Sequence, residues 1–523
     1  MKKTLTRMLS LGAALVLCLT LVLTGCAQGN TPATSSGGAP ASSAGASSAE
    51  QDIVEIQILA PLFSDPPDMT NEFWTKYQEL TRSKLKVEWV DSGNFHDVFH
   101  LRIASADLPE VAGVPDKRSP VLLQAIDNGA FWDLTDTLGD FSEYTNLRDN
   151  VALNCYKYLS VNNRIYATPR SRTMIDLGVN IRKDWFDKLG IPLPTNVKEY
   201  ADALEKIVKS DPDGNGVNDT IGLVHAGADG SLPGSLDAAF GALTPQYDSE
   251  GGQYPPKLND GYIEYVTYMR DLYARGILDP EYAGIKHEDG FSKFSTNRAA
   301  SYIMSIWHHW EWEKGSAQVQ KDPVPEVTSV ILDGINGNKS VRLNTGVSGG
   351  YYVSSKVPEE KMKRIVRYFD DATTQEVTFL AYYGIEGIHH DLVDGTPVLN
   401  SKGIEQINVS SKCVGPLAYA RYGKVDSAGG TKEYNAAKRE MVKDYESVGK
   451  IDFWGTGILI SPTWANNWPK YEDEFNANMS KTIAGQMSVE DFRAYVENLR
   501  ANPEIKPAFA EFAASYEAMF GTK

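Results

Sequence analysis

Residues 54–60 read VEIQILA, in which apolar residues alternate with the polar Glu55 and Gln57. Alternation with a period of two predicts a half-buried β-strand. The same analysis of the following residues predicts a helix over 73–80, a strand over 85–89, a helix over 95–103 and a strand over 110–114. This β-α-β-α-β order favours an open α/β sheet with helices on its faces.

Further along the chain, helices are indicated by cap residues followed by an apolar stripe. Asn196 precedes a stripe that runs to Val208, with Glu199 three residues after the cap, as in a capping box. Residues 362–369 repeat the stripe, and Ser488 caps another that ends at Leu499. No internal repeat is visible, and the length of 523 residues suits two or three domains.

The first 25 residues have the pattern of an export signal. Three basic residues precede the apolar stretch 9–23, which is too short to span a membrane permanently. The sequence Leu-Thr-Gly-Cys that ends at Cys26 resembles the lipobox of bacterial lipoproteins, in which the cysteine is acylated. Each buried CH₂ of an acyl chain contributes about 0.8 kcal/mol to membrane binding. We predict a signal peptide over 1–25 and a lipid anchor at Cys26 on the outer face of the cell membrane; an ordinary secreted protein is the alternative.

The next segment, residues 26–50, is composed almost wholly of small and polar residues with a single charge. Such a composition cannot bury an apolar core, so it predicts a flexible tether. The formal net charge of the whole chain is −17, and removal of the basic signal makes it more negative. Nucleic acid is therefore excluded as a partner. After the signal and the anchor, only Cys155 and Cys413 remain, and whether they pair is left open.

Residues 211–219 read DPDGNGVND, the most specific local signal in the chain. Oxygen-bearing side chains at positions 1, 3, 5 and 9, with glycine at position 6, match the start of an EF-hand calcium loop. Position 12, which usually carries a bidentate carboxylate, is Gly222. We predict a structural Ca²⁺ site, with an ion-free polar turn as the alternative. The predicted ligands are Asp211, Asp213, Asn215, the carbonyl of Val217, Asp219 and Thr220.

Several sequence patterns resemble those of enzymes but lack the other residues or the secondary structure that the catalytic site requires. His96 and His100 have the spacing of a zinc-protease helix, but aspartate replaces the general-base glutamate. Residues 346–350 fit the G-x-S-x-G string of serine hydrolases, yet the residues that follow favour a strand rather than the required helix. Glu386 is the acid that we single out, either to orient a ligand or to cap a turn. We predict that the protein is not an enzyme; a surface-anchored glycan hydrolase with two close carboxylates is the alternative.

Aromatic residues cluster in the second half of the chain. Flat aromatic faces beside polar side chains suit sugar rings, because the C–H faces stack while the hydroxyls form hydrogen bonds. We expect most of these aromatic side chains to lie in the core, and two or three of them to contact the ligand. The clusters are Trp307, Trp310 and Trp312; Tyr351-Tyr352; Tyr382-Tyr383; and Trp454, Trp464 and Trp468.

Several segments together resemble the extracellular solute-binding proteins, family 1, of bacterial ABC importers, especially the long lipoproteins of Gram-positive bacteria. The loop at 211–219 is similar to that of the alginate-oligosaccharide binders among them, with Thr220 in place of an acid. The matching segments lie in order along most of the chain. They are the lipobox and tether, LRIASADLPE (101–110), IRKDWFDKLG (181–190), the 211–219 loop and YGIEGIH (383–389).

This resemblance implies an α/β, two-lobed periplasmic-binding-protein-like fold of type II, whose lobes are joined by crossing hinge strands. Lobe one would hold residues 51–170 and 350–400, and lobe two residues 171–349 and 401–523. The crossings would be Tyr166–Asn180, Thr345–Tyr352 and the residues near Asn400. The chain would be a monomer that captures a carbohydrate, an oligosaccharide, and delivers it to an ABC permease in the membrane. A sensory binder is a further alternative.

Positions relative to the crossings then give the candidates that line the ligand cleft. They are Arg170, Arg172, Asp176, Trp307, Trp310, Tyr351, Tyr383, Glu386 and Trp454.

Overall fold

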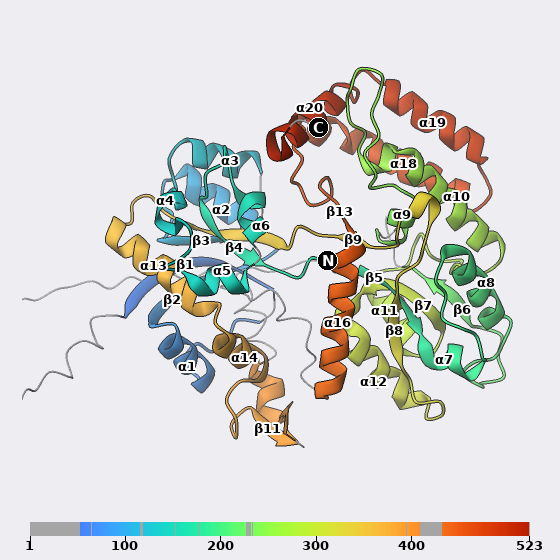
Figure 1. Cartoon of the computed structure of the whole chain (residues 1–523), viewed down its shortest axis with the longest axis horizontal. Coiled ribbons are helices and arrows are strands. Elements are labelled where there is room, and N and C mark those ends of the chain that lie inside the picture. Colours follow the sequence, from blue (N-terminus) through green and yellow to red (C-terminus); the bar gives the residue numbers. More distant parts are fainter. Residues whose placement is uncertain are drawn as a thin grey trace, which may run out of the picture. The chain divides into compact units, whose positions relative to one another are not determined.

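The β-α-β-α-β start predicted from the sequence is present in the computed structural model (Figure 1). Its elements are β1 (Val54–Leu62), α1 (Glu72–Leu80), β2 (Ser83–Asp91), α2 (Phe95–Ala104) and β3 (Val111–Val114). The structure describes residues 53–63, 65–115, 119–151, 153–175, 177–225, 232, 234–393, 395–407 and 431–521. The predicted signal, anchor and tether, together with Asp176 and Cys413, lie outside the described residues.

The first sheet has the strand order β2-β1-β3-β10-β4, where β4 spans Ala167–Ser171 and β10 spans Val347–Val353. Strands β1, β2 and β3 are parallel, and β10 runs antiparallel to both β3 and β4. Helix α13 (Glu359–Ala372) packs on β1, and α14 (Gln375–Tyr383) packs on α1, as the orange and blue ribbons of Figure 1 show. The remaining helices of this part are α3 (Pro120–Asp127), α4 (Thr135–Leu138), α5 (Thr145–Asn150) and α6 (Leu153–Leu159).

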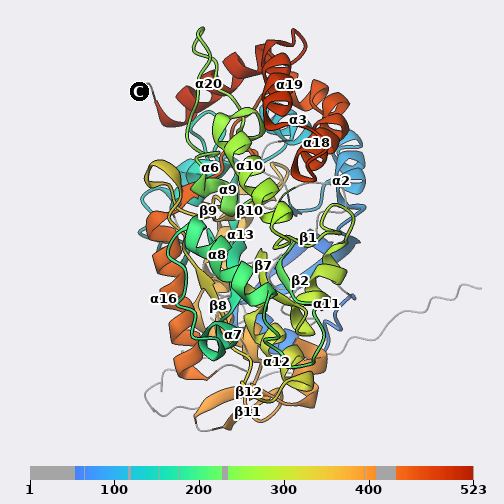
Figure 2. The same ribbon diagram turned by 90° about the vertical axis from the view of Figure 1, so that its right-hand side faces the viewer.

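The second sheet has the order β6-β7-β5-β8, formed by β5 (Leu177–Arg182), β6 (Ile221–Val224), β7 (Ala299–Ser305) and β8 (Val327–Val330). Strand β5 is antiparallel to β7 and β8, and β6 is parallel to β7. Helix α10 (Asp260–Ala274) packs against α18 (Pro469–Ile483) and α19 (Val489–Ala501), which Figure 2 shows in green and red. Residues from both halves of the chain thus build this part.

The other described elements connect or cover these two sheets. The helices are α7 (Lys183–Lys188), α8 (Val197–Val208), α9 (Leu236–Ala239), α11 (His287–Ser295), α12 (His309–Val319), α16 (Lys432–Val448), α17 (Pro462–Asn467) and α20 (Pro507–Phe520), with short 3₁₀ turns η2 (Pro256–Leu258), η3 (Ile306–His308) and η4 (Ile335–Gly337). The strands are β9 (Arg342–Leu343), β11 (His390–Val393), β12 (Thr396–Leu399) and β13 (Lys450–Ile451).

Each sheet has its own hydrophobic core. The first core takes buried residues from 54–167 and 347–407 together with Ile458, and includes Trp74 and Tyr352. The second takes residues from 179–332 and 459–512, and includes Trp185 and Phe475. Two α/β lobes with separate cores, joined by strands that cross between them, confirm the predicted fold class. The lobe limits drawn from the resemblance stay a prediction.

Local cap signals predicted the helix starts correctly. The Asn196 side chain accepts a hydrogen bond from the backbone N–H of Glu199 (2.9 Å), and the Glu199 carboxylate accepts one from the backbone N–H of Thr195 (2.9 Å). Ser488 likewise accepts from the N–H of Asp491 (2.9 Å) at the start of α19. Each cap satisfies an N–H that has no partner within the helix. These bonds fix where α8 and α19 begin.

Arg342, the first residue of strand β9, is the centre of an ion-pair cluster with two buried carboxylates. The Arg342 guanidinium bonds to the carboxylates of Asp237, in α9, and Asp452, which follows β13; these side chains are 1% and 5% exposed. Burial alone would lower the pKa of Arg342, but the charges of Asp237 and Asp452 outweigh it and raise that pKa. A buried charge is tolerated only when it is paired. The ion pairs of Arg342 therefore hold α9, β9 and the segment after β13 together.

We expect the substitution Arg342→Ala to lower the free energy of unfolding by about 3–5 kcal/mol, because it leaves two buried carboxylates without their cation. The matched control is Arg148→Ala, which removes an exposed arginine paired with Asp149 (2.7 Å) and should cost no more than about 1 kcal/mol. Urea unfolding followed by tryptophan fluorescence measures both. Equal losses in the two variants would contradict the structural role of Arg342.

Candidate functional site

Two chain segments cross between the lobes and bond to each other. Residues 172–175 lead from β4 towards β5, and residues 344–346 lead from β9 to β10. The backbone N–H of Arg172 donates to the carbonyl of Gly346 (2.7 Å), and that of Asn344 donates to Met174 (2.6 Å). The two crossings are therefore one short antiparallel ribbon. The third predicted crossing, near Asn400, continues through helical residues 401–407 and then leaves the described part of the chain.

An exposed aromatic ring and an arginine meet at one edge of the first sheet. Parallel strands β1 and β3 end at this edge, β4 also ends there, and the antiparallel β10 begins there. Phe63 follows β1 and is 45% exposed, and the Arg170 guanidinium lies over its ring at 5.0 Å from the centroid. Arg170 Nη1 donates to the Ser348 hydroxyl (3.0 Å). The carboxyl edge of an open α/β sheet is where such folds bind ligands.

Tyr351 supports this arginine from inside the lobe. Its ring is 1% exposed and stacks on Phe369, with centroids 4.8 Å apart. Burial raises the pKa of Tyr351, and the positive charges of Arg170 and Arg172 oppose that rise, which places its hydroxyl near both guanidinium groups. The buried ring offers no face to a ligand. Tyr351 belongs to the core, with only its hydroxyl directed towards the arginines.

In the second lobe, Trp307 lies next to the crossing. Leu177, the first residue of β5, pairs with Ser305, the last residue of β7, so these strand ends share an edge. Trp307 follows in η3 and is partly exposed. It packs with Met174 on a small apolar cluster that contains Ile175, Ile306 and Leu343. Met174 and Ile175 belong to the first crossing itself and Leu343 immediately precedes the second, so Trp307 packs beside the crossings.

Trp310 has a different environment. It lies in α12, where its ring meets Tyr434 of α16 edge to face (5.4 Å between centroids) and Lys314 Nζ lies 4.7 Å from it. One turn away, Lys438 of α16 bonds to the buried ring of His309. Burial lowers the pKa of Lys438 to about 8. Trp310 therefore takes part in packing α16 against α12.

The remaining predicted ligand residues occupy separate places. Tyr383 is buried at the end of α14 and packs on Phe379 (4.8 Å). Glu386 is exposed on the turn between α14 and β11. Trp454 packs partly buried on the second core, with its Nε1 buried and without a hydrogen-bond partner among the described residues. The structure thus gathers Arg170, Arg172 and the Tyr351 hydroxyl, and adds Phe63, which our sequence reasoning missed.

The 211–219 loop forms a polar turn in which side chains accept backbone hydrogen bonds. Backbone N–H groups of Asn215 and Gly216 donate to the Asp211 carboxylate (3.1 and 2.8 Å). The Asn215 amide Nδ2 donates to Asp213 Oδ2 (2.9 Å) and Asp219 Oδ1 (3.5 Å). Desolvation first, and then the neighbouring Asp211, raise the pKa of Asp213, whereas the Gly216 N–H lowers that of Asp211. The loop therefore concentrates negative charge around one amide group.

The donor set of this loop fits a hard cation. The Asn215 amide oxygen accepts a hydrogen bond from the backbone N–H of Val217 (2.6 Å), so the loop holds this oxygen and the carboxylates of Asp211, Asp213 and Asp219 in one turn. Calcium prefers such carboxylate and amide oxygens. Counting His, Cys, Asp and Glu alone, the described residues contain no group of three or more that could hold a metal ion. A cation here would thus depend on Asn215 and backbone oxygens as well.

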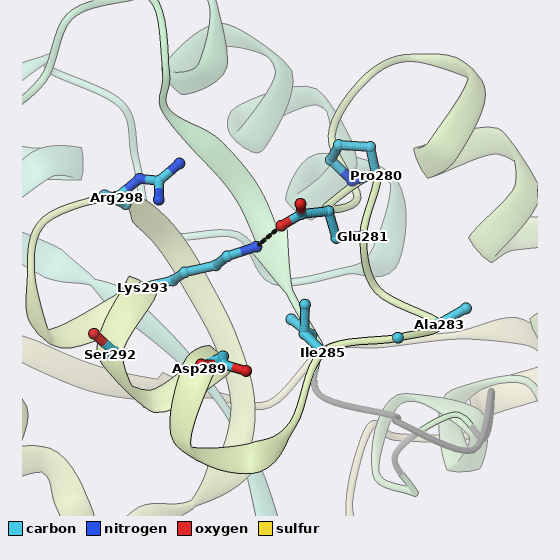
Figure 3. A pocket seen from close by; sticks show the side chains of 9 residues that line it. Pro280, Glu281, Ala283, Ile285, Asp289, Ser292, Lys293 and Arg298 are labelled. Carbon is cyan, nitrogen blue, oxygen red and sulfur yellow. Dashed lines mark hydrogen bonds and ion pairs between the residues drawn. The ribbon is translucent and has the colours of Figure 1, made fainter.

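A pocket of about 740 Å³ lies close to this loop, between residues 280–285 and 289–298 (Figure 3). Lys293 points across it, and its Nζ donates to Glu281 and Asp279, both at 2.7 Å. Arg298, at its rim, lies 3.8 Å from Asp219. None of the predicted ligand residues lines this pocket. The ammonium group of Lys293 at the centre of the pocket already bonds to two carboxylates. Lys293 therefore stabilises the packing around the loop.

Among the described residues, no helix combines the length and the apolar character needed to cross a membrane.

Comparison with known proteins agrees with this architecture. The model of the bacterial extracellular solute-binding protein family matches residues 60–370, more than half of the chain. The chain belongs to this family. Lipoprotein LipO of Bacillus subtilis is 27% identical over 392 residues, covering 72% of each chain. The polygalacturonan/rhamnogalacturonan-binding protein YtcQ of the same organism is 24% identical over 382 residues, covering 72% of this chain and 73% of its own.

A solved structure shares the fold. It is the EF-hand mutant of the substrate-binding protein FusA from Streptococcus pneumoniae in complex with fructo-nystose. The TM-score is 0.58 at 16% identity, over 88% of this chain and 99% of that one. Members of the family are extracellular solute-binding proteins, so the fold and the family agree on a protein that captures a solute.

We expect Gly346→Ala to destabilise the crossing. Gly346 has φ +75°, and a Cβ there would lie 3.3 Å from both Cys155 Sγ and Met174 Cγ. Gly485, with φ +76° and open space around it, is the matched control. Both variants suffer the backbone strain of about 1 kcal/mol, but only Gly346→Ala adds a clash, so its midpoint in thermal unfolding should be the lower. Equal midpoints would contradict tight packing at the crossing.

Proposed function

We propose that this protein is the substrate-binding lipoprotein of an ABC importer, which captures a carbohydrate and delivers it to a membrane permease. The observation that carries the proposal is the exposed Phe63 ring beneath Arg170 and Ser348, at the carboxyl edge of a sheet and beside the crossing of two lobes. A flat apolar face combined with directed hydrogen-bond donors is the arrangement that a sugar ring requires. An oligosaccharide is the ligand class that we propose.

The relatives support the carbohydrate class and the membrane anchor. YtcQ is named as a polygalacturonan/rhamnogalacturonan-binding protein, and the FusA structure contains fructo-nystose. LipO is named as a lipoprotein. We therefore propose that residues 1–25 are a cleaved signal peptide and that Cys26 is acylated. The anchored protein would act as a monomer on the extracellular face of the cell membrane, close to its permease.

The lobes would close on the ligand and open again without altering it. A ligand stabilises the closed state only by contacts that the open state lacks. Phe63 and Trp307 would supply stacking faces from the two lobes, and Arg170 and Arg172 would donate hydrogen bonds. Further candidate contacts are Asp176, Trp310, Glu386 and Trp454, whereas Tyr351 and Tyr383 would act through packing.

Isothermal titration calorimetry with neutral and acidic oligosaccharides tests the carbohydrate proposal. We expect at least one saccharide to bind, and Phe63→Ala to weaken its binding by roughly tenfold, the effect of losing about 1.4 kcal/mol of stacking. Phe379→Ala, at a ring exposed to a similar extent (44%) beside Tyr383, is the matched control.

Three outcomes would contradict the proposal. The first is that no saccharide binds. The second is that Phe379→Ala weakens binding and Phe63→Ala does not, which would move the site to α14. The third is that mass spectrometry finds a shortened saccharide after incubation, which would make the protein a hydrolase.

We also propose a structural calcium site in the 211–219 loop. The ligands would be the side chains of Asp211, Asp213, Asn215, Asp219 and Thr220 and the carbonyl of Val217. Supporting this proposal, FusA is described as having an EF-hand, and a calcium ion would neutralise the carboxylates that otherwise raise the pKa of Asp213. The role of the ion would be structural, because it would connect the end of α8 with the start of β6.

Added Ca²⁺ should therefore raise the melting temperature, because a ligand that binds only the folded state stabilises it. We expect Asp213→Asn to abolish this increase and Asp187→Asn, at an exposed carboxylate in α7, to retain it. Protons compete with calcium for the Asp213 carboxylate, whose pKa is raised, so the increase should shrink as the pH falls towards the range where carboxylates titrate. An increase that is the same in Asp213→Asn would contradict the site.

A further inference from the structure

A buried histidine joins helix α16, orange in Figure 1, to the second sheet. His309 is the first residue of α12 and is 1% exposed. Its Nε2 lies 2.7 Å from Asn180 Oδ1 of β5 and 3.0 Å from the Ser329 hydroxyl of β8. The other ring nitrogen, Nδ1, is bonded to Lys438 Nζ of α16. One imidazole thus connects two strands of the sheet with a helix that follows more than a hundred residues later.

The surroundings of Asn180 decide which nitrogen of this imidazole carries the proton. The amide nitrogen of Asn180 donates to three backbone carbonyls, those of Gly178 (3.2 Å), Tyr302 (2.9 Å) and Met304 (2.8 Å). This orientation turns Oδ1, which can only accept, towards the histidine, so Nε2 must be the donor. A neutral imidazole has a single N–H, and Nδ1 is therefore the bare nitrogen that accepts from the lysine. The contact with α16 requires the neutral form of His309.

A second proton on this histidine is incompatible with the contact. Nδ1 would then carry an N–H aimed at the Lys438 ammonium group, and two positive charges would meet beside a buried ring. Burial first, and then the charges of Lys438 and His308, hold the pKa of His309 well below its usual value. When α16 moves away, the imidazole regains its ordinary pKa of about 6.5. A falling pH therefore favours the undocked helix from about that value downwards.

The carboxyl group nearest to the contact acts in the opposite sense. Glu313 of α12 accepts from the backbone N–H of Val327 (2.9 Å), and burial raises the pKa of this carboxyl. A proton on Glu313 consequently favours the docked helix as the pH falls. Glu326, just before β8, places a second negative charge near Lys438. The effect of the histidine must therefore be measured against that of Glu313.

The remaining groups around the contact do not change charge between pH 5 and 7. Burial lowers the pKa of Lys438 to about 8, so the lysine is charged below pH 7 whether α16 is docked or not. Burial raises the pKa of Tyr434, whose ring lies 5.0 Å from the lysine Nζ, so its phenol stays neutral. Asn180 and Ser329, which β5 and β8 present to the imidazole, are neutral side chains.

The other end of α16 reaches the crossing between the lobes. The Tyr445 hydroxyl donates to the carbonyl of Val330 (3.0 Å), and the Glu446 carboxylate accepts from the backbone N–H of Met174 (3.3 Å). Val442 and Tyr445 also belong to the apolar cluster at the crossing. A single helix therefore contacts α12 near one end and the crossing near the other, so loss of its docking loosens the crossing.

We infer that the contact between His309 and Lys438 makes the docking of α16, and with it the tightness of the crossing, dependent on pH. Above about pH 6.5 the neutral imidazole accepts from the lysine and the helix stays docked. Below that value a proton enters at Nδ1, the two cations separate, and α16 leaves α12. The device acts without a solute, so it does not depend on the proposed function.

Hydrogen–deuterium exchange of the purified protein, resolved by peptide with mass spectrometry between pH 5 and 7.5, measures the opening of α16. After correction for the intrinsic effect of pH on exchange, we expect the opening of residues 432–448 to increase roughly tenfold between pH 6 and pH 5, the effect of one proton. The peptide over the crossing residues 172–175 should open in parallel. Helix α19, in the same lobe, is the internal reference and should keep its protection.

Variants assign the effect to the histidine. His309→Gln cannot gain a proton, so the opening of α16 should be independent of pH, whether its level is low or high. Lys438→Met removes the second cation and should shrink the increase. The matched control is His308→Gln, which removes the neighbouring, partly exposed histidine that bonds to Glu311 (2.6 Å) and should retain the tenfold increase. Glu313→Gln removes the opposing titration and should make the increase at least as large.

Two results would overturn the inference. One is a wild-type α16 whose protection is the same at pH 7 and pH 5. The other is an acid-dependent opening that persists unchanged in both His309→Gln and Lys438→Met. If α16 opens while residues 172–175 keep their protection, the link from the helix to the crossing is wrong. None of these measurements uses a saccharide, so their failure leaves the proposed function in place, and a failure to bind saccharides leaves the device in place.

Discussion

Everything that is arranged around the site depends on backbone hydrogen bonds between two strands that cross from one lobe to the other. Arg172 donates to Gly346, and Asn344 donates to Met174. Because these bonds link the end of β4 to the start of β10, they align the edge of the first sheet with the strand ends that carry Trp307. The apolar cluster beneath them and the Arg342 ion pairs keep the ribbon in place. The crossing is thus a joint with well-defined contacts.

The arginines of this molecule lie in two different kinds of surroundings. Where carboxylates enclose the side chain, as at Arg342, the charge is compensated inside the protein and stabilises the fold. At Arg170 the guanidinium donates to the Ser348 hydroxyl and lies over the Phe63 ring. Arg342 is therefore held between two buried carboxylates, whereas Arg170 is partly exposed beside an aromatic ring.

The sequence predicted well what is local and poorly what depends on partners far away in the chain. Alternation over residues 54–60 and the caps at Asn196 and Ser488 are short-range signals, and the structure confirms all three. Tyr351 was expected at the ligand, but its neighbours β3 and β4 come from distant segments, and their packing places its ring in the core. Trp310 meets Tyr434, more than a hundred residues away. Phe63 was missed because only the strand order shows that β1 ends beside Arg170.

The position of β10 has a consequence for how the chain is made. This strand fills the place between β3 and β4, yet it is translated only after all four strands of the second sheet. The second core, in turn, waits for residues as late as Phe512. A nascent chain consequently completes its first sheet only at residue 353, and its second core only when its synthesis is nearly finished. Interleaving the two lobes along the gene delays native structure, and an unfolded polypeptide is the form that a narrow secretion channel can thread.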